Sequence, residues 1–461
     1  MIRTQQLITS QHSSSSVKIL SGIMLFLLIL ALFIPGHEFI AEGQARWVFT
    51  DVGQGIMPSL ALDPQGNPHV TFIRIGENGW VRYASLQNSQ WQISQIASGD
   101  LYGPPSIAVD EQGRPHIVWL DHDSPDEIVY PGNERCLSVI VCKPSPGGNA
   151  IHAFLVNGEW VRDDITYPGH DGWDATVVIG KDGVPRVAAV EPDLFNNPSP
   201  GIEYAEQKTA GKWEVLHVDS LEGENYSHGT SIALDSRDRP YIAYFDDSRR
   251  DLRIAILRDG EWIIDVVDSQ GDAGRFPNIV MDRRGNPTVA YLELITSTTG
   301  WVKVASKTQT GWVTERVDQL DNLFLQAFSV DPRGARNIIS VAFDSRNIPH
   351  IVYSDEAVLK HATKQGEVWK VETILRSEEG IFGQTTSLEI DSNNRLNLVF
   401  VQAPTKNPVQ SQWNVRYGTT HVNTNGSFFE SNFTFQLAVL VVAAFSGIFI
   451  FHKASRRRKV K

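Results

Sequence analysis

The sequence repeats one short pattern seven times between residues 59 and 401. Each copy has a small residue, an apolar stretch, a turn that begins with Asp, and a Pro that opens a second apolar stretch, as in 106–119 and 231–244. The turn residues are Asp63, Asp110, Gly180, Asp235, Asp282, Asp344 and Asp391. Three of the six intervals between them are 47 residues and the other three are longer, so one unit recurs with insertions. Repeats of this length with several short strands are typical of β-propeller blades.

The fourth copy shows the strands expected of one blade, which we letter A to D in chain order. They are 231–234, 241–245, 252–257 and 261–267. The seventh copy lacks strand D, but the N-terminal segment 46–52 matches 261–267 and has no other partner. We therefore expect this segment to pair with 414–418 and to complete the last blade, which protects both sheet edges. The sequence predicts an all-β, seven-bladed propeller over 46–422, closed by its N-terminal strand.

Two apolar runs of 17 residues, 19–35 and 435–451, flank the propeller and predict two hydrophobic membrane helices. Segment 1–45 fits either a signal peptide cleaved after Ala45 or an uncleaved N-terminal anchor. A linker at 423–434 leads to the transmembrane helix at 435–452. The basic tail 453–461 should stay in the cytoplasm. The sequence therefore predicts a cell-membrane protein with its propeller, a monomeric ectodomain, on the extracytoplasmic side.

The net charge of the chain narrows the classes of possible partner. The net charge is −12, and since the leading segment contributes +2 and the tail +6, residues 19–452 carry −20 (−12 − 8). Nucleic-acid binders need a basic face, so this class of partner is disfavoured.

Cys136 and Cys142 are the only cysteines, and in an oxidising compartment we expect a local disulfide between them. The alternative is two unpaired thiols.

The turn before strand D carries the one family signal. Its copies at 157–160, 210–213 and 259–262 have Gly followed two positions later by Trp. This hairpin resembles a degenerate Asp-box of the sialidase-type propeller repeats, although its spacing is shorter and the Ser of the box is absent. The resemblance covers 46–421 and indicates no catalytic subfamily. It implies that these turns are structural and lie away from any active site, in a superfamily of sialidases, polysaccharide lyases and noncatalytic surface proteins.

Blade geometry divides the polar residues between two rims. The A–B and C–D turns share one rim, here called the turn rim, and the B–C and D–A connections share the other, the loop rim. On the turn rim we expect each repeated Asp to accept backbone N–H groups of its own turn. His69, His116 and His350 occupy one repeated position directly after the Pro, so a structural role is expected for them too.

On the loop rim, seven polar residues follow strand B at equivalent points: Arg74, Asp121, Glu191, Asp246, Glu293, Asp355 and Gln402. We expect them to surround the channel mouth and bind a ligand. Like charges there raise one another's pKa or recruit a cation, and calcium suits an all-oxygen site, so Asp121, Asp246 and Asp355 are predicted metal ligands. Replacing Asp246 and Asp355 by Asn should then leave the fold intact or stabilise it. The alternative is that each acid caps its own turn or pairs with a neighbouring arginine.

The D–A connections on the same rim each carry an aromatic residue: Tyr102, Trp173, Tyr226, Phe276, Phe324 and Phe382. Exposed rings beside carboxylates would suit a sugar, whereas buried ones would pack between blades. The function favoured is a membrane-anchored propeller that binds a glycan, cation or protein on this rim. The alternatives are a carbohydrate-active enzyme, either a glycoside hydrolase or a polysaccharide lyase, and an envelope scaffold. The three arginines that a sialidase needs cannot be assigned.

We predict that protease added to intact cells removes the propeller and spares the tail 453–461, because the tail is cytoplasmic and the propeller is outside. Immunoblotting against each end of the chain reads this out. A propeller that stays protected in intact cells, but is digested after lysis, would contradict the topology.

Overall fold

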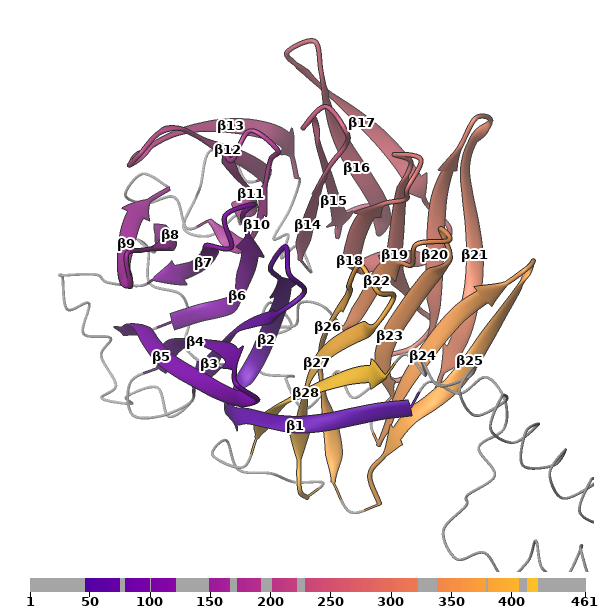
Figure 1. Cartoon of the computed structure of the whole chain (residues 1–461). Helices are drawn as coiled ribbons and strands as arrows, with labels where there is room; N and C mark the ends of the chain where they lie inside the picture. The colour runs from indigo at the N-terminus through magenta and orange to yellow at the C-terminus, as the bar shows by residue number, and fades with distance from the viewer. Residues whose placement is uncertain are drawn as a thin grey trace, which may run out of the picture. The chain divides into compact units, whose positions relative to one another are not determined.

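Seven four-stranded antiparallel sheets make up the part of the chain that the structure describes. This part comprises residues 46–74, 79–99, 101–121, 149–165, 172–191, 201–221, 229–321, 338–355, 357–378, 380–405 and 413–421. The sheets stand around a common centre as blades in this computed structural model (Figure 1). The predicted all-β, seven-bladed propeller is therefore confirmed.

Blades 1 to 3 follow one another in the first part of the chain. Blade 1 consists of β2 (Ile56–Leu62), β3 (Pro68–Arg74), β4 (Gly79–Gln87) and β5 (Gln90–Gly99). Blade 2 consists of β6 (Leu101–Val109), β7 (Pro115–Asp121), β8 (Asn149–Val156) and β9 (Glu159–Asp164). Blade 3 consists of β10 (Trp173–Ile179), β11 (Pro185–Glu191), β12 (Gly201–Thr209) and β13 (Lys212–Ser220).

Blades 4 to 6 follow the same order. Blade 4 consists of β14 (Thr230–Leu234), β15 (Pro240–Asp246), β16 (Asp251–Arg258) and β17 (Glu261–Asp268). Blade 5 consists of β18 (Asp272–Met281), β19 (Pro287–Leu294), β20 (Gly300–Thr308) and β21 (Gly311–Leu320). Blade 6 consists of β22 (Ile339–Phe343), β23 (Pro349–Asp355), β24 (Val358–Gln365) and β25 (Val368–Arg376).

Blade 7 joins the two ends of the propeller. It consists of β26 (Ile381–Ile390), β27 (Leu396–Ala403), β28 (Asn414–His421) and the N-terminal strand β1 (Arg46–Gln54), in the sheet order β1-β28-β27-β26. Figure 1 shows the indigo β1 alongside the yellow β28. A Cβ on Gly418 of β28 would approach the ring of Phe49 to 2.6 Å, so glycine is needed where β1 packs closely. The predicted closure is confirmed.

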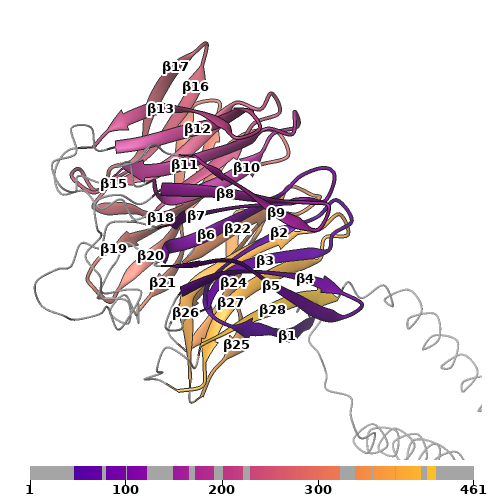
Figure 2. The same ribbon diagram turned by 90° about the vertical axis from the view of Figure 1, so that its left-hand side faces the viewer.

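The core lies between the blades, whose strands run alongside one another in the view of Figure 2. The Trp of each strand D packs against the preceding blade. Trp262 of blade 4 meets the ring of Tyr204 of blade 3 edge-on at 5.3 Å, and Trp160 of blade 2 meets Tyr83 of blade 1 at 5.2 Å. The Gly-x-Trp turns are thus structural, because they place this aromatic wedge between neighbouring sheets.

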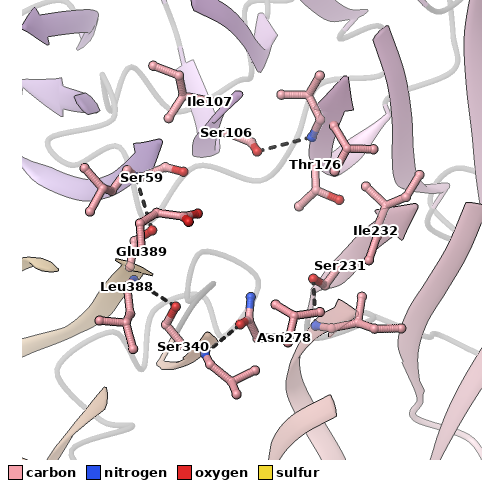
Figure 3. A pocket seen from close by; sticks show the side chains of 18 of the residues that line it. Ser59, Ser106, Ile107, Thr176, Ser231, Ile232, Asn278, Ser340, Leu388 and Glu389 are labelled. Atoms are coloured by element: carbon pink, nitrogen blue, oxygen red, sulfur yellow. Dashed lines mark hydrogen bonds between the residues drawn. The ribbon is translucent and has the colours of Figure 1, made fainter. Parts of the chain in front are cut away.

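Strand A of each blade is innermost and lines a central cavity of about 400 Å³ (Figure 3). One small polar residue per blade rings it: Ser59, Ser106, Thr176, Ser231, Asn278, Ser340 and Ser387. In five blades this side chain accepts a backbone N–H from strand A of the next blade, as Ser340 Oγ does from Leu388 at 2.9 Å. These bonds join the inner sheet edges in sequence around the ring.

Both predicted membrane segments, residues 19–35 and 435–451, lie outside the described ranges. Within those ranges, no helix is long and apolar enough to cross a membrane.

Candidate functional site

Six carboxylates close the A–B turns on the turn rim. One oxygen of each accepts the backbone N–H groups two and four positions later; for Asp235 these belong to Arg237 and Arg239, at 2.9 and 3.0 Å. The same two bonds form at Asp63, Asp110, Asp282, Asp344 and Asp391. The structural role expected of these residues is therefore confirmed.

The second oxygen of the turn Asp binds a side chain of the same turn. Asp235 Oδ2 accepts from Arg239 Nε at 2.7 Å, and Asp110 accepts in the same way from Arg114 at 2.6 Å. Burial alone would raise the pKa of Asp235, but the bonds from Arg239 and from the backbone of Arg237 outweigh it and hold that pKa below its ordinary value. The carboxylate is thus ionised and committed to its turn.

Blade 3 keeps this turn without the Asp. The backbone bonds of Gly180 are the same as those of the turn Asp elsewhere. The space of the missing carboxylate is filled by Arg186, because a Cβ on Gly180 would approach Arg186 Nη1 to 2.1 Å. Arg186 in turn pairs with Asp182 at 2.7 Å. In blade 3 the Arg186 guanidinium therefore occupies the space that the turn carboxylate fills in the other blades.

The three repeated histidines link strands B and C inside their own blades. His116 Nδ1 lies 3.0 Å from His152 Nε2, and His350 Nδ1 lies 2.9 Å from His361 Nε2. His69 Nδ1 lies 2.6 Å from the hydroxyl of Tyr83. Burial, followed by the neighbouring histidine, lowers the pKa of His116 and of His350 to about 4. These rings are neutral at neutral pH and belong to the structure of the turn rim.

The seven residues predicted on the loop rim lie at the last or next-to-last position of strand B, but none of them lines the central cavity. Side chains two positions apart on a strand point to the same face. Asp246 follows Tyr244 by two, and the Tyr244 hydroxyl donates to Asp219 of the preceding blade at 2.5 Å. The acids therefore face the neighbouring blade, so the expectation that they surround the channel mouth is not met.

Blades 4, 5 and 6 repeat one arrangement at this interface, which we call the interblade latch. A Tyr of strand B donates to an Asp at the end of the preceding strand D, and a cation of strand C bridges that Asp and the acid that ends strand B. The three sets are Tyr244, Asp219, Arg253 and Asp246; Tyr291, Asp268, Lys303 and Glu293; and Tyr353, Asp318, Lys360 and Asp355. Lys360 Nζ, for example, lies 2.9 Å from Asp318 and 3.1 Å from Asp355.

The sequence carries a signal for the latch in the pairing of two repeated positions. The Tyr occurs where the preceding strand D has Asp six positions after its Trp. In blades 1 and 7 the Tyr is replaced by Phe72 and Phe400, and the preceding strands have Gly53 and Leu375 in place of the Asp. The hydroxyl is therefore present where an acceptor exists for it, as a buried polar group requires.

Blades 7 and 1 also have an arginine at the strand C position of the latch cation, but its contacts differ from those in blades 4 to 6. Arg416 of β28 donates to the Gln402 side chain at 2.7 Å and to Asp51 of β1 at 3.0 Å. In blade 1, the guanidinium groups of Arg74 and Arg82 both lie over the ring of Trp80, at 5.0 and 5.3 Å from its centroid. Neither predicted residue, Arg74 or Gln402, takes part in an acidic cluster.

Blades 2 and 3 depart from the pattern. The strand C position that is Arg or Lys in the other five blades is Ile151 in blade 2 and Glu203 in blade 3. The strand B acids beside them, Asp121 and Glu191, are both buried. The longest B–C connection of the propeller, 122–148, leaves the sheet directly after Asp121. These two adjacent blades therefore form the sector of the loop rim that differs from the rest.

Of the aromatic residues predicted on the loop rim, the structure describes the side chains of two. Phe276 and Phe382 are 3% and 1% exposed and belong to hydrophobic clusters, so their rings pack in the core and do not face solvent. Tyr102 lies on β6 and Trp173 begins β10, but only their backbones are described. Tyr226, Phe324, Cys136 and Cys142 lie outside the described residues.

The predicted metal ligands come from three separate blades. Asp121, Asp246 and Asp355 end strands β7, β15 and β23. In the ranges that the structure describes, no group of three or more His, Cys, Asp or Glu side chains is arranged to hold a metal ion. Asp246 and Asp355 instead bind the latch cations Arg253 and Lys360.

Comparison with known proteins supports the fold. No protein-family model matches the sequence, and no curated protein matches it. An ulvan lyase, from a new family of polysaccharide lyases and bound to a sugar, superposes with a TM-score of 0.55 at 12% identity, covering 80% of this chain and 95% of the lyase. A microbial sialidase gives a TM-score of 0.47 at 11% identity, covering 80% of this chain and 66% of the sialidase. These likenesses are to the propeller fold.

We predict that Asp246→Asn lowers the free energy of unfolding by about 3 kcal/mol, because it breaks a buried ion pair with Arg253. If the acids of the loop rim only repelled one another, removing the charge of Asp246 would stabilise the fold, so the sign of the expected change is the opposite. Burial opposes ionisation of Asp246, but bonds from Ser248 and Arg249 and the charge of Arg253 hold its pKa below the ordinary value. Its contribution should therefore be present near neutral pH and disappear as the pH falls through that lowered pKa. Denaturant unfolding at several pH values measures both effects.

Asp251→Asn is the matched control. Asp251 pairs in register with Asp246 and, within the described residues, has no hydrogen bond or ion pair. Burial, together with the nearby charges of Asp246 and Asp268, raises the pKa of Asp251 above its ordinary value. Its removal should be neutral or stabilising. Equal losses from the two substitutions would contradict the latch.

Proposed function

We propose that the chain is a membrane-anchored, extracytoplasmic propeller that binds a glycan on the loop rim of blades 2 and 3. The observation that carries this proposal is the departure of these two blades from the pattern of the other five. Ile151 and Glu203 stand at the strand C position where each of the other five blades has Arg or Lys. Both changes fall in adjacent blades, on the rim where the longest B–C connection leaves the sheet. Surface loops at such a place are where binding residues concentrate.

The chemistry of the sector suits a polyhydroxylated ligand. Asp121, Glu191 and Glu203 supply carboxylate acceptors for sugar hydroxyl groups, and Trp173 begins β10 at the same rim. Binding sites for sugars combine such acceptors with aromatic faces. The fold likeness to an ulvan lyase suggests which ligands to try first. It is not evidence of activity, because one fold supports many functions.

A second function, cleavage of the bound glycan, would use the same residues. Glycoside hydrolysis requires two carboxylates at a suitable separation. Neighbouring blades 2 and 3 together bring three acids to this rim. Binding and cleavage are therefore to be measured on the same samples.

The test is a glycan array probed with the full-length protein, with and without calcium. We predict that the wild type binds at least one polysaccharide. The double variant Ile151→Lys, Glu203→Arg should bind about tenfold more weakly or worse, because it installs the cations of the other blades and removes an acceptor. Product analysis after incubation shows whether the bound glycan is also cut. The calcium arm tests whether a cation contributes.

Glu261→Arg is the control for charge, since it makes the same Glu-to-Arg change as the Glu203→Arg part of the double variant, at an exposed position beside the C–D turn. It should bind as the wild type does. No glycan bound by the wild type, or equal binding by the two variants, would overturn the proposal. Thermal unfolding of each variant checks that the fold is retained.

A further inference from the structure

One position in the central channel breaks the propeller's internal repeat. Two residues after the ring of small polar side chains, strand A has a small apolar residue in six blades: Ala61, Ala108, Val178, Ala233, Val280 and Ala342. In blade 7 the same position is Glu389. Figure 3 shows its carboxylate pointing into the open space of the channel. A charged side chain has therefore replaced a methyl or isopropyl group at one of seven equivalent points.

The Glu389 carboxylate has no counter-ion in its surroundings. Every other residue lining the cavity is uncharged. Among the residues that the structure describes, none donates a hydrogen bond to Glu389 or forms an ion pair with it. Glu389 is partly exposed and lines the cavity. An isolated carboxylate in such surroundings is costly unless it is protonated or meets a cation.

Burial alone raises the pKa of Glu389 to about 7. The group thus stands near half-ionised at neutral pH, and a bound cation would favour its charged form. This cost is avoidable, since Ala or Val fills the position in every other blade. A residue that weakens the fold without a structural partner points to a ligand.

We infer that the central channel is a binding site for a small amine that carries hydroxyl groups, with its ammonium group on Glu389. One carboxylate matches one positive charge, whereas hard divalent ions collect several carboxylates. The ring hydroxyls supply the rest of the site. Ser231, Ser340 and Ser387 accept a backbone N–H from the next blade, which leaves their own O–H groups to donate to a ligand oxygen. The cavity of about 400 Å³ is of the size that small ligands occupy.

The test is isothermal titration of the full-length protein with 2-aminoethanol hydrochloride, against sodium chloride of equal ionic strength and against ethylene glycol. We expect binding of the amine alone. Glu389→Ala should weaken it about tenfold or more, because the charge-assisted bond is lost, and should leave the melting temperature equal or higher. Binding should also weaken as the pH falls through about 7, where Glu389 takes up its proton.

A rescue variant separates this site from a merely structural role. Ala233 also lines the cavity, so Ala233→Glu in the Glu389→Ala background returns a carboxylate to the channel from blade 4. It should restore amine binding. Glu389→Gln gives a second, isosteric test of the lost charge. No heat of binding in the wild type, equal affinity in Glu389→Ala, or no rescue by Ala233→Glu would each overturn the inference. None of these results bears on glycan binding at blades 2 and 3.

Discussion

Seven sheet edges meet at the centre of the propeller, and the rest of the structure depends on satisfying their backbone N–H groups. An unpaired buried donor costs about as much as a lost hydrogen bond. In five of the seven blades the repeat solves this with a hydroxyl or amide side chain of strand A, which accepts from the next blade, as Asn278 does from Val341 at 2.9 Å. This explains why each copy begins with a small polar residue. The position two residues closer to the turn rim is Ala or Val in six of the seven blades, where the strands converge.

A second set of polar contacts acts farther out, at the loop rim. In blades 4, 5 and 6 the latch ties each blade to its predecessor through a shared Asp, such as Asp268 between Tyr291 and Lys303. Blades 2 and 3 lack the latch cation, and blade 7 replaces the acid with Gln402. The latch is therefore regular in blades 4 to 6, and glycan binding is proposed at two adjacent blades that depart from it, blades 2 and 3.

The sequence predicts the fold well because the repeat supplies seven internal copies. The strand order, the closure by β1 and the turn carboxylates could all be read from spacing and from the missing strand of blade 7. The loop-rim acids could be placed at the end of strand B, but their direction could not. A strand's alternation shows which side chains share a face, and it does not show whether that face meets the channel or a neighbouring blade. The partners Arg253, Lys303 and Lys360 come from another strand, so spacing along the chain hides them. Glu389 could be recognised in the sequence as the one charged residue at a strand A position that is otherwise Ala or Val. Only the structure shows that this side chain lines the central channel.

The most direct measurement of the central claim compares two serines of the ring. Ser340 accepts the Leu388 N–H at 2.9 Å, whereas Ser59 occupies the equivalent position with no such bond among the described residues. Ser340→Ala should lower the free energy of unfolding by about 1–3 kcal/mol, because the Leu388 donor is left without its acceptor. Amide hydrogen exchange at Leu388 should quicken in the same variant. Ser59→Ala should change the free energy of unfolding little. Equal losses at the two positions, or unchanged exchange at Leu388, would contradict the claim that these bonds hold the inner edges of the blades together.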